Sequence, residues 1–206
     1  MSKINKTVSS WDDRYADDDY LFGTEPNGFL SLVANTIPAN SRVLCLADGE
    51  GRNGVYLASL GHKVTSLDLS QVGLNKATQL AEKNQVDIET IQADLSTHDL
   101  GIESWDCIVS IFFHIPPALQ ATIYPRIIEA LKPGGRLILE SYTPDQLQFG
   151  TGGPPIASLM LTREIVETAF AALSFDHLQE LERDVTEGLG HTGRAAVLQL
   201  LATRPV

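Results

Sequence analysis

The segment Gly49–Gly54 has the pattern Gly-x-Gly-x-x-Gly. An apolar run, residues 42–46, comes before it, and a predicted helix over residues 53–60 follows. Glycines at such a strand-to-helix turn allow the backbone to approach a ligand at the helix N-terminus. A tight turn that binds nothing uses the same residues, so the motif alone leaves both interpretations open.

Two aspartates occupy further positions where a ligand could be bound. Asp68 follows the predicted strand 63–67, nineteen positions after Gly49, where a carboxylate can accept hydrogen bonds from both hydroxyls of a ribose. Asp94, followed by Leu95, comes just after the predicted strand 88–92 and can accept from an adenine amino group. Each aspartate taken alone could equally be a turn residue.

These positions share one property, which is that each follows a predicted strand. Asp48, Asp68, Asp94 and the pair Phe113-His114 follow four consecutive strands. In open α/β sheets, ligands bind outside the carboxyl ends of the strands. The spacing therefore predicts one elongated site for a nucleoside.

The charge of the glycine-rich loop bears on which nucleoside binds. Asp48 and Glu50 would repel the pyrophosphate of a dinucleotide. S-adenosylmethionine has no phosphate and carries a sulfonium cation, so an acidic loop suits it better. Arg52 partly offsets this argument, which leaves an NAD(P)-dependent oxidoreductase as an alternative.

The elements that must position these residues alternate between strand and helix. Strands are predicted over 42–46, 63–67, 88–92, 105–113 and 136–141, and helices over 53–60, 70–84 and 117–131. Continuously apolar strands that alternate with helices indicate a parallel sheet covered on both faces. Right-handed crossovers then give a doubly wound α/β fold.

The two ends of the chain have a different character. Residues 11–27 are rich in aromatics and aspartates, and a short helix is predicted over 28–35. Residues 142–161 hold many glycines and prolines and are predicted to form a long loop, with 149–154 as a substrate lid. A helix over 162–173 and strands over 177–183 and 195–202 follow. Residues 188–193 are interpreted as a hairpin turn or as a loop on the substrate side.

Composition narrows the functional class. The 206 residues suit one domain, and the net charge of −11 disfavours a nucleic-acid substrate. Cys45 and Cys107 lie in apolar runs and are expected to be buried thiols, with no pattern typical of a metal site. Residues 1–13 lack a signal-peptide core, and no apolar run reaches membrane-spanning length. We therefore expect a cytoplasmic protein that has no membrane partner.

Together these motifs resemble the seven-strand, Rossmann-like S-adenosylmethionine-dependent methyltransferases. The run Val43–Asn53 is similar to their first motif, Asp68 and Asp94-Leu95 to the second and third, and Leu131–Leu139 to the turn and strand after the site. The wording Gly-Glu-Gly-Arg-Asn is closest to the tellurite-resistance and thiopurine-type branch. The chain departs from the family at Cys45, where an acid is usual, and at Ala47, where glycine is usual. An acid stands instead at Asp48.

The resemblance implies a seven-stranded, mostly parallel sheet whose last strand is antiparallel, in a three-layer sandwich. It implies a single domain over 1–206, with an N-terminal cap (1–40), a cofactor-binding core (41–141) and a C-terminal part (142–206). The cap is expected to fold over S-adenosylmethionine, with Arg14 pairing with the methionine carboxylate. The expected cofactor-binding residues are Arg14, Ala47, Asp48, Gly49, Gly51, Arg52, Asn53, Asp68, Leu69, Asp94, Leu95, Ser110 and Ile111.

The expected reaction is methyl transfer to a small-molecule acceptor by in-line displacement, which chiefly requires that donor and acceptor be aligned. His114 is the candidate catalytic residue, as a general base, although a hydrogen-bonded histidine of the pocket wall fits the sequence equally well. A protein that binds S-adenosylmethionine without catalysis is a further alternative, since the fold does not fix the function.

Overall fold

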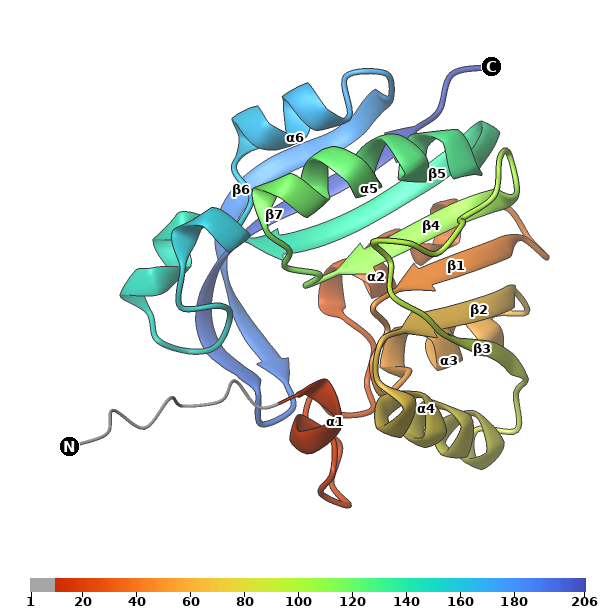
Figure 1. The fold of residues 1–206 in the computed structure, drawn as a ribbon, viewed down its shortest axis with the longest axis vertical. Helices are drawn as coiled ribbons and strands as arrows, with labels where there is room; N and C mark the ends of the chain where they lie inside the picture. Colours follow the sequence, from red (N-terminus) through yellow and green to blue (C-terminus); the bar gives the residue numbers. More distant parts are fainter. Residues whose placement is uncertain (1–9) are drawn as a thin grey trace.

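The computed structural model describes residues 10–206, which form one seven-stranded sheet with helices on both faces (Figure 1). Residues 1–9 of the expected N-terminal cap lie outside the described part. The strands are β1 (Arg42–Leu46), β2 (Lys63–Asp68), β3 (Ile88–Gln92), β4 (Trp105–Ile111), β5 (Leu131–Tyr142), β6 (Ser174–Glu187) and β7 (His191–Thr203).

The strand order in the sheet is β3-β2-β1-β4-β5-β7-β6. Strands β1 to β5 pair in parallel, whereas β7 runs antiparallel between β5 and β6. The order reverses at β1, which pairs with β2 on one side and β4 on the other. This confirms the predicted doubly wound sheet with an antiparallel last strand, and it places the switch point of the topology directly after β1.

The helices are α1 (Trp11–Arg14), α2 (Gly28–Val33), α3 (Arg52–Ser59), α4 (Gln71–Lys83), α5 (Pro117–Ala130) and α6 (Arg163–Ala169), with short 3-10 turns at Ala34–Thr36, Pro144–Gln148 and Ala157–Leu159. Ser70 accepts the backbone N–H of Gly73 and so caps α4. Helix α5 begins at Pro117, where a missing N–H costs no hydrogen bond. In the described residues, no helix is long and apolar enough to cross a membrane.

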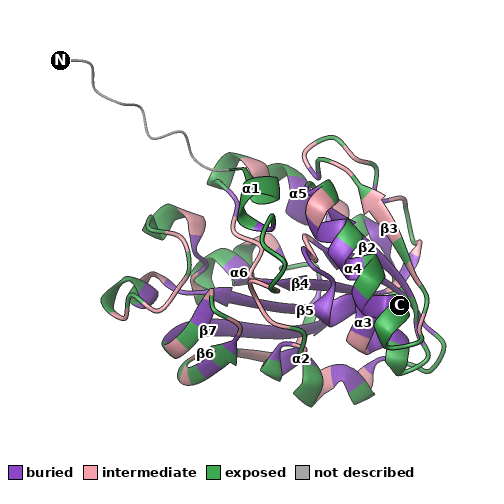
Figure 2. Cartoon of the chain, turned by 90° about the horizontal axis from the view of Figure 1, so that it is seen from below, coloured by how far each residue is buried: buried purple, intermediate pink, exposed green. Residues whose placement is uncertain are grey.

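Two apolar layers hold the helices on the sheet, and the central strands are buried between them (Figure 2). Helices α5 and α6 cover one face, where Ile127 and Phe170 are fully buried. On the other face, Phe29 of α2 and Leu57 of α3 pack against β1 and β4. Both cysteines are buried free thiols, as predicted.

The last two strands are longer than predicted, because their paired register continues to Glu187 and His191. The sequence shows no apolar run there, since residues 184–187 of β6 are Asp, Val, Thr and Glu. On the inner side β7 pairs with β5 only as far as Val197, opposite Tyr142. The hairpin therefore extends past the carboxyl end of β5. Strand β4 in turn ends at Ile111 rather than 113, because Phe112 has a left-handed φ of 53°.

Candidate active site

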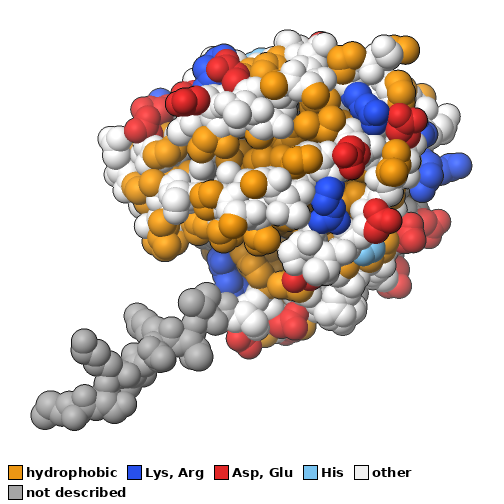
Figure 3. Space-filling view, turned by 45° about the horizontal axis from the view of Figure 1, so that its top comes forward, with side chains coloured by type: hydrophobic (Ala, Val, Ile, Leu, Met, Phe, Trp, Pro, Cys, Tyr) orange, Lys and Arg blue, Asp and Glu red, His pale blue; other side chains and the backbone are white. Residues whose placement is uncertain are grey.

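A cavity of about 550 Å³ lies beyond the carboxyl ends of β1, β2 and β4. On the molecular surface, apolar side chains gather in and around a hollow next to the start of the described chain (Figure 3). Most of the predicted site residues line this cavity, although they come from segments far apart in the sequence. They are Arg14, Ala47, Asp48, Arg52, Asn53, Asp68, Leu69, Asp94, Leu95, Ile111 and His114.

Three predicted cofactor residues stand behind the cavity wall rather than in it. Ser110 is buried within β4. Gly51 has a φ of 84°, and a Cβ built there would collide with Ala77 of α4, so this glycine allows loop and helix to pack closely. Gly49 contributes its backbone N–H to Asp68 and is covered by the Tyr15 ring. The structure thus gives these two glycines packing roles.

Asp68 joins the glycine-rich loop to the next helix. Its Oδ2 accepts the N–H of Gly49 and its Oδ1 the N–H of Ser70, each at 2.8 Å. Burial raises the pKa of this carboxyl, against the lowering effect of the two backbone hydrogen bonds. Each carboxylate oxygen retains a lone pair. Asp68 can therefore still accept from two hydroxyls of a bound molecule.

Ala47 and Asp48 are the two unusual residues of the loop, and each has a different local environment. Ala47 adopts a φ of 49°, a left-handed conformation that favours glycine. Asp48 turns toward β2, where its Oδ2 accepts the Ser66 hydroxyl at 2.6 Å. Burial raises the pKa of Asp48 to about 6, and the Ser66 hydrogen bond opposes this shift. Gly54 packs against the side chains of Asp48 and Ser66, so a larger residue at position 54 would displace them.

Arg52 and Asn53 connect the loop to the far hairpin. Arg52 Nη2 lies 2.6 Å from Glu187 Oε2, with both side chains buried. Asn53 accepts the N–H of Asn27, whose side chain in turn donates to Glu140 and Glu187. Arg183 closes this buried network on the same two glutamates. The charge of Arg52 is thereby neutralised within the protein.

The charge of Glu50 is also balanced. It forms a buried ion pair with Lys76 at 2.5 Å. Lys76 Nζ donates as well to the carbonyls of Asp17 and Asp19. Glu50 and Arg52 were expected to be among the charges that a ligand meets, but both are neutralised by ion pairs within the protein. Asp48 and Asp68 remain as carboxylates at the cavity wall.

The N-terminal segment forms one side of the cavity with Trp11, Arg14, Tyr15 and Phe22. The Arg14 guanidinium lies 4.3 Å from the centre of the Trp11 ring, and it forms no salt bridge with any residue in 10–206. The N-terminal cap was predicted to be rich in aromatic residues, but no contact of Tyr15 with the glycine-rich loop was predicted. That residue is buried, with its hydroxyl over Gly49.

Asp94 and Leu95 contribute the wall beyond β3. Asp94 is exposed, and its Oδ1 accepts the N–H of Ser96 at 2.8 Å. Hydrogen bonds from Ser96 hold the pKa of Asp94 below its usual value. Leu95 is buried in the core next to α5. Asp94 thus offers a hydrogen-bond acceptor to the cavity, while Leu95 offers an apolar surface.

His114 lies among aromatic rings at the other end of the cavity. Its ring stacks on Tyr142 with centres 5.5 Å apart, and its Nε2 accepts the backbone N–H of Tyr142 at 3.3 Å. Burial lowers the pKa of His114 to about 4. This imidazole is neutral at physiological pH, and the hydrogen bond engages its unprotonated nitrogen.

The remaining residues around His114 come from segments that were not predicted to meet. Phe112, Gly152, Pro154 and His191 line the cavity with His114. The predicted lid 149–154 does reach the cavity. The tip of the β6–β7 hairpin also reaches it, since Gly190 and His191 line the cavity. The Gly190 N–H donates to the Leu21 carbonyl and so joins this tip to the N-terminal segment. The cluster of glycines at 188–193 is thus both a hairpin turn and part of the cavity wall.

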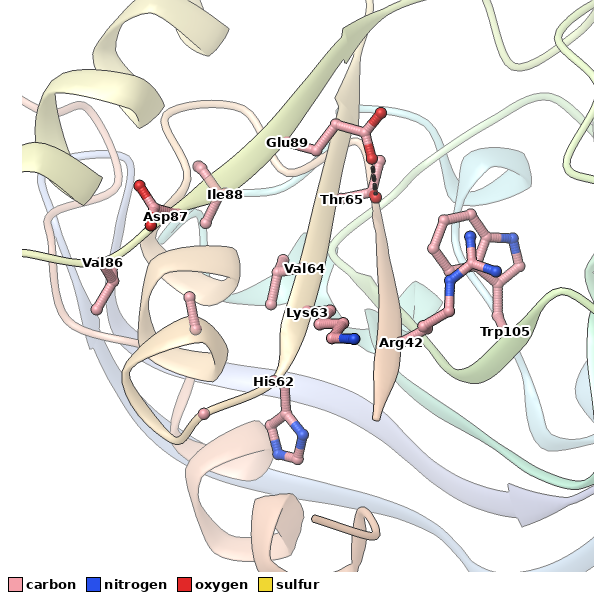
Figure 4. Close-up of a pocket in the computed structure, with 12 residues that line it drawn as sticks. Arg42, His62, Lys63, Val64, Thr65, Val86, Asp87, Ile88, Glu89 and Trp105 are labelled. Atoms are coloured by element: carbon pink, nitrogen blue, oxygen red, sulfur yellow. Dashed lines mark hydrogen bonds between the residues drawn. The ribbon is translucent and has the colours of Figure 1, made fainter. Parts of the chain in front are cut away.

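A second hollow, of about 640 Å³, lies at the opposite ends of β1 to β3 (Figure 4). There the Arg42 guanidinium stacks 5.0 Å from the centre of the Trp105 ring, and the Thr65 hydroxyl donates to Glu89. This groove is open and contains none of the predicted site residues. The predicted site residues lie instead toward the carboxyl ends of the strands.

The chain matches one protein family model, described as a methyltransferase domain, over residues 43–135. It is 33% identical over 113 residues to the uncharacterized methyltransferase YbaJ of Bacillus subtilis, across 53% of this chain and 44% of YbaJ. It is 30% identical over 109 residues to a probable S-adenosyl-L-methionine-dependent methyltransferase TehB of Haemophilus influenzae, across 52% of this chain and 38% of TehB. The chain thus spans less than half the length of these curated relatives.

Solved structures share the fold over a larger part of the chain. TehB from Haemophilus influenzae superposes with a TM-score of 0.70 at 23% identity, covering 86% of this chain and 62% of TehB. The N-methyltransferase NodS from Bradyrhizobium japonicum, in complex with S-adenosyl-l-homocysteine, superposes with a TM-score of 0.70 at 15% identity, covering 95% of this chain and 97% of NodS. At these identities the likeness concerns the fold.

Proposed function

We propose that this chain is an S-adenosylmethionine-dependent methyltransferase related to TehB, and that it transfers a methyl group from S-adenosylmethionine to a small-molecule acceptor. The observation that carries the proposal is the position of Asp68, Asp94 and Leu95 around one cavity at the switch point of the sheet. The acceptor class is part of the proposal, because curated relatives include enzymes named for tRNA and for a ribosomal protein.

The residues at the cavity fit S-adenosylmethionine. Asp68 has free lone pairs for two ribose hydroxyls, and the exposed Asp94 can accept from the adenine amino group beside the apolar Leu95. Asp48 and Asp68 supply negative charge near the glycine-rich loop, which suits a molecule with an ammonium and a sulfonium group. Arg14 is the nearby cation for the methionine carboxylate.

The cofactor would supply an electrophilic methyl group when bound, and the protein residues would mainly align the acceptor and exclude water. Three segments enclose the acceptor end: the N-terminal segment, the loop 149–155 and the hairpin tip. A cavity of about 550 Å³ bordered by these three segments suits a small molecule rather than a folded protein or nucleic acid. We propose residues 11–27 as the cap over this site.

The predicted role of His114 as general base has a geometric obstacle. Its Nε2 already accepts a backbone N–H, and its pKa is lowered to about 4. A base with that pKa holds a proton weakly at neutral pH. We therefore propose that His114 shapes the acceptor pocket. We also propose that the acceptor atom carries a free lone pair when it binds, so that His114 need not remove a proton from it.

The alternative of an NAD(P)-dependent oxidoreductase has weaker support. A pyrophosphate at this loop would face Asp48 and Asp68, while Arg52 is already paired with Glu187. A non-catalytic S-adenosylmethionine-binding protein would share every contact of the cofactor half. Only a measurement of turnover separates it from an enzyme.

Thermal unfolding with two ligands tests the cofactor. S-adenosylhomocysteine at a hundred times its dissociation constant should stabilise the protein by about 2.7 kcal/mol, and NAD should not. The variant Asp68→Asn should lose most of this stabilisation, whereas Asp106→Asn, remote from the cavity, should keep it. A shift with NAD alone would refute the proposal. Transfer of a radiolabelled methyl group to a panel of small thiols, amines, acids and oxyanions then tests catalysis.

A further inference from the structure

Lys76 is a lysine of α4 that is only 8% exposed, although it does not line the cavity. Lysine is rarely buried unless its charge and its three N–H donors are paired. The ammonium lies 2.5 Å from a carboxylate oxygen of Glu50 in the glycine-rich loop. It also donates to the carbonyls of Asp17 and Asp19, at 2.8 and 2.7 Å. Lys76 therefore joins the glycine-rich loop to the cap.

The part of the cap that Lys76 contacts has little other support. Residues 16–19 are exposed and belong to no helix or strand, and they form no backbone–backbone hydrogen bond within 10–206. Next to them, the Tyr20 hydroxyl donates to the Lys76 carbonyl at 3.0 Å, and the Tyr20 ring centre lies 4.9 Å from the ammonium. Ordering an irregular segment costs conformational entropy, so other groups must hold it in place. Lys76 supplies these contacts between α1 and Tyr20.

The path of this segment determines where two residues of the cavity lie. Arg14 and Tyr15 directly precede it, and both line the cavity. Tyr15 is buried, and a Cβ built on Gly49 would lie 2.6 Å from its hydroxyl. Helix α1 lies beside α4 (Figure 1), where Asp12 accepts the Ser70 hydroxyl. The position of Arg14 and Tyr15 at the cofactor half therefore depends on the attachment of the cap to α4.

We propose that Lys76 is a positioning residue for the cofactor, and that its ammonium holds the cap closed over the cavity. Lys76 acts through Arg14 and Tyr15, because it does not itself reach the bound molecule. The identity of that molecule rests on the proposed function. The apparent affinity for a ligand falls with the fraction of protein whose binding site is formed. Loss of Lys76 should therefore weaken binding in proportion to the opening of the cap.

Two variants separate positioning from stability. Glu50→Gln leaves a buried ammonium without its carboxylate but keeps the hydrogen bonds of Lys76 to the cap. Lys76→Met combined with Glu50→Gln removes both charges, and neutral replacements of a buried ion pair are often as stable as the pair. In urea, the double variant should therefore be at least as stable as Glu50→Gln. If Lys76 were only structural, ligand affinity would follow this order, whereas positioning predicts the reverse.

Calorimetric titration with S-adenosylhomocysteine measures the affinity. The double variant should bind roughly 10-fold or more weakly than Glu50→Gln, because it lacks two charge-assisted hydrogen bonds to the cap. Lys132→Met is the matched control, since it breaks a partly exposed pair with Asp106 away from the cavity, and it should bind like the wild type. Equal affinity of the double variant and Glu50→Gln would overturn the proposal.

A protease that cuts before aspartate measures the opening of the cap without any ligand. Residues 17–19 are consecutive exposed aspartates. They should be cut roughly 10-fold faster in the double variant than in Glu50→Gln, because cleavage follows the population of the opened segment. Cleavage at Asp87, which is exposed at the other hollow, should be equal in both.

Equal cleavage at residues 17–19 would also overturn the proposal. Failure of the proposed function has a separate signature, which is that the wild-type chain does not bind S-adenosylhomocysteine. The cleavage comparison then still decides whether Lys76 holds the cap.

Discussion

Arg52 and Glu187 form a buried ion pair between the glycine-rich loop and the tip of the β6–β7 hairpin, with Nη2 and Oε2 2.6 Å apart. They are far apart in the sequence, one directly after the loop and the other at the end of β6. Burial alone would raise the pKa of Glu187, but Arg52 and Arg183 hold it below its usual value. The pair thus connects the cofactor half of the cavity to its acceptor half.

Removing the charge of Glu187 should destabilise the protein strongly. Glu187→Gln leaves Arg52 buried without its carboxylate, and breaking a buried pair in this way costs about 3 kcal/mol. Glu182→Gln is the matched control on the same strand, because its pair with Arg194 is about half exposed and contributes under about 1 kcal/mol. Urea unfolding of both variants compares the two losses. Equal losses would contradict the structural role of the network.

Asp48 should make stability depend on pH in the acid range. Its folded pKa of about 6 lies above the ordinary value, so its stabilising contribution is complete at low pH and is lost as pH rises through about 6. Asp48→Asn should remove this dependence and raise the free energy of unfolding at pH 7 by up to about 3 kcal/mol. Unfolding curves of both proteins between pH 4 and 7.5 measure it. Parallel curves would show that Asp48 ionises normally.

His114 should titrate far below neutral pH. Burial lowers its pKa to about 4, so its ring resonances in an NMR titration should stay constant above about pH 5. The pH profile of kcat between pH 6 and 8 should then have the same shape in the wild type and in His114→Gln. Loss of such a limb in the variant would instead establish His114 as the general base.

Gly188 should be intolerant of a side chain for steric reasons. Its φ is 70°, and a Cβ there would collide with the backbone of Phe22 and Gly23. Gly61 is a matched control, with a φ of 88° and no atom within 4 Å of a built Cβ. Both alanine variants should lose about 1 kcal/mol from backbone strain. Only Gly188→Ala should also weaken S-adenosylhomocysteine binding, by displacing Phe22. Calorimetric titration distinguishes the two variants.

The fold was predictable from the sequence because most of its strands are continuous apolar runs. The strands β1 to β3 lie within one residue of their predicted bounds, whereas β5 begins at Leu131, five residues before the predicted start. The outer part of the β6–β7 hairpin was not predictable, since residues 184–187 and 191–194 are mostly charged or polar and are ordered by pairing between the two strands. Phe112 ended β4 early through a backbone angle that no local pattern indicates.

The site was predictable to a similar extent. Aspartates after strands signalled the cofactor half, since strand ends meet at one edge of the sheet. The charge balance was not visible, because Lys76 and Glu187 neutralise Glu50 and Arg52 from distant segments. Tyr142 was expected only as the start of a loop. Its unpartnered hydroxyl is a property of the packed structure that sequence spacing cannot express.

The contact of Leu21 with Gly190 has a consequence for the order of folding. One of the first described segments closes against one of the last, so the loop between them is nearly the whole chain, and such distant contacts form late. During synthesis the parallel strands β1 to β5 can assemble before the hairpin tip has left the ribosome. The enclosed cavity can form only afterwards. Ligand binding would therefore report on the completion of folding as well as on the site itself.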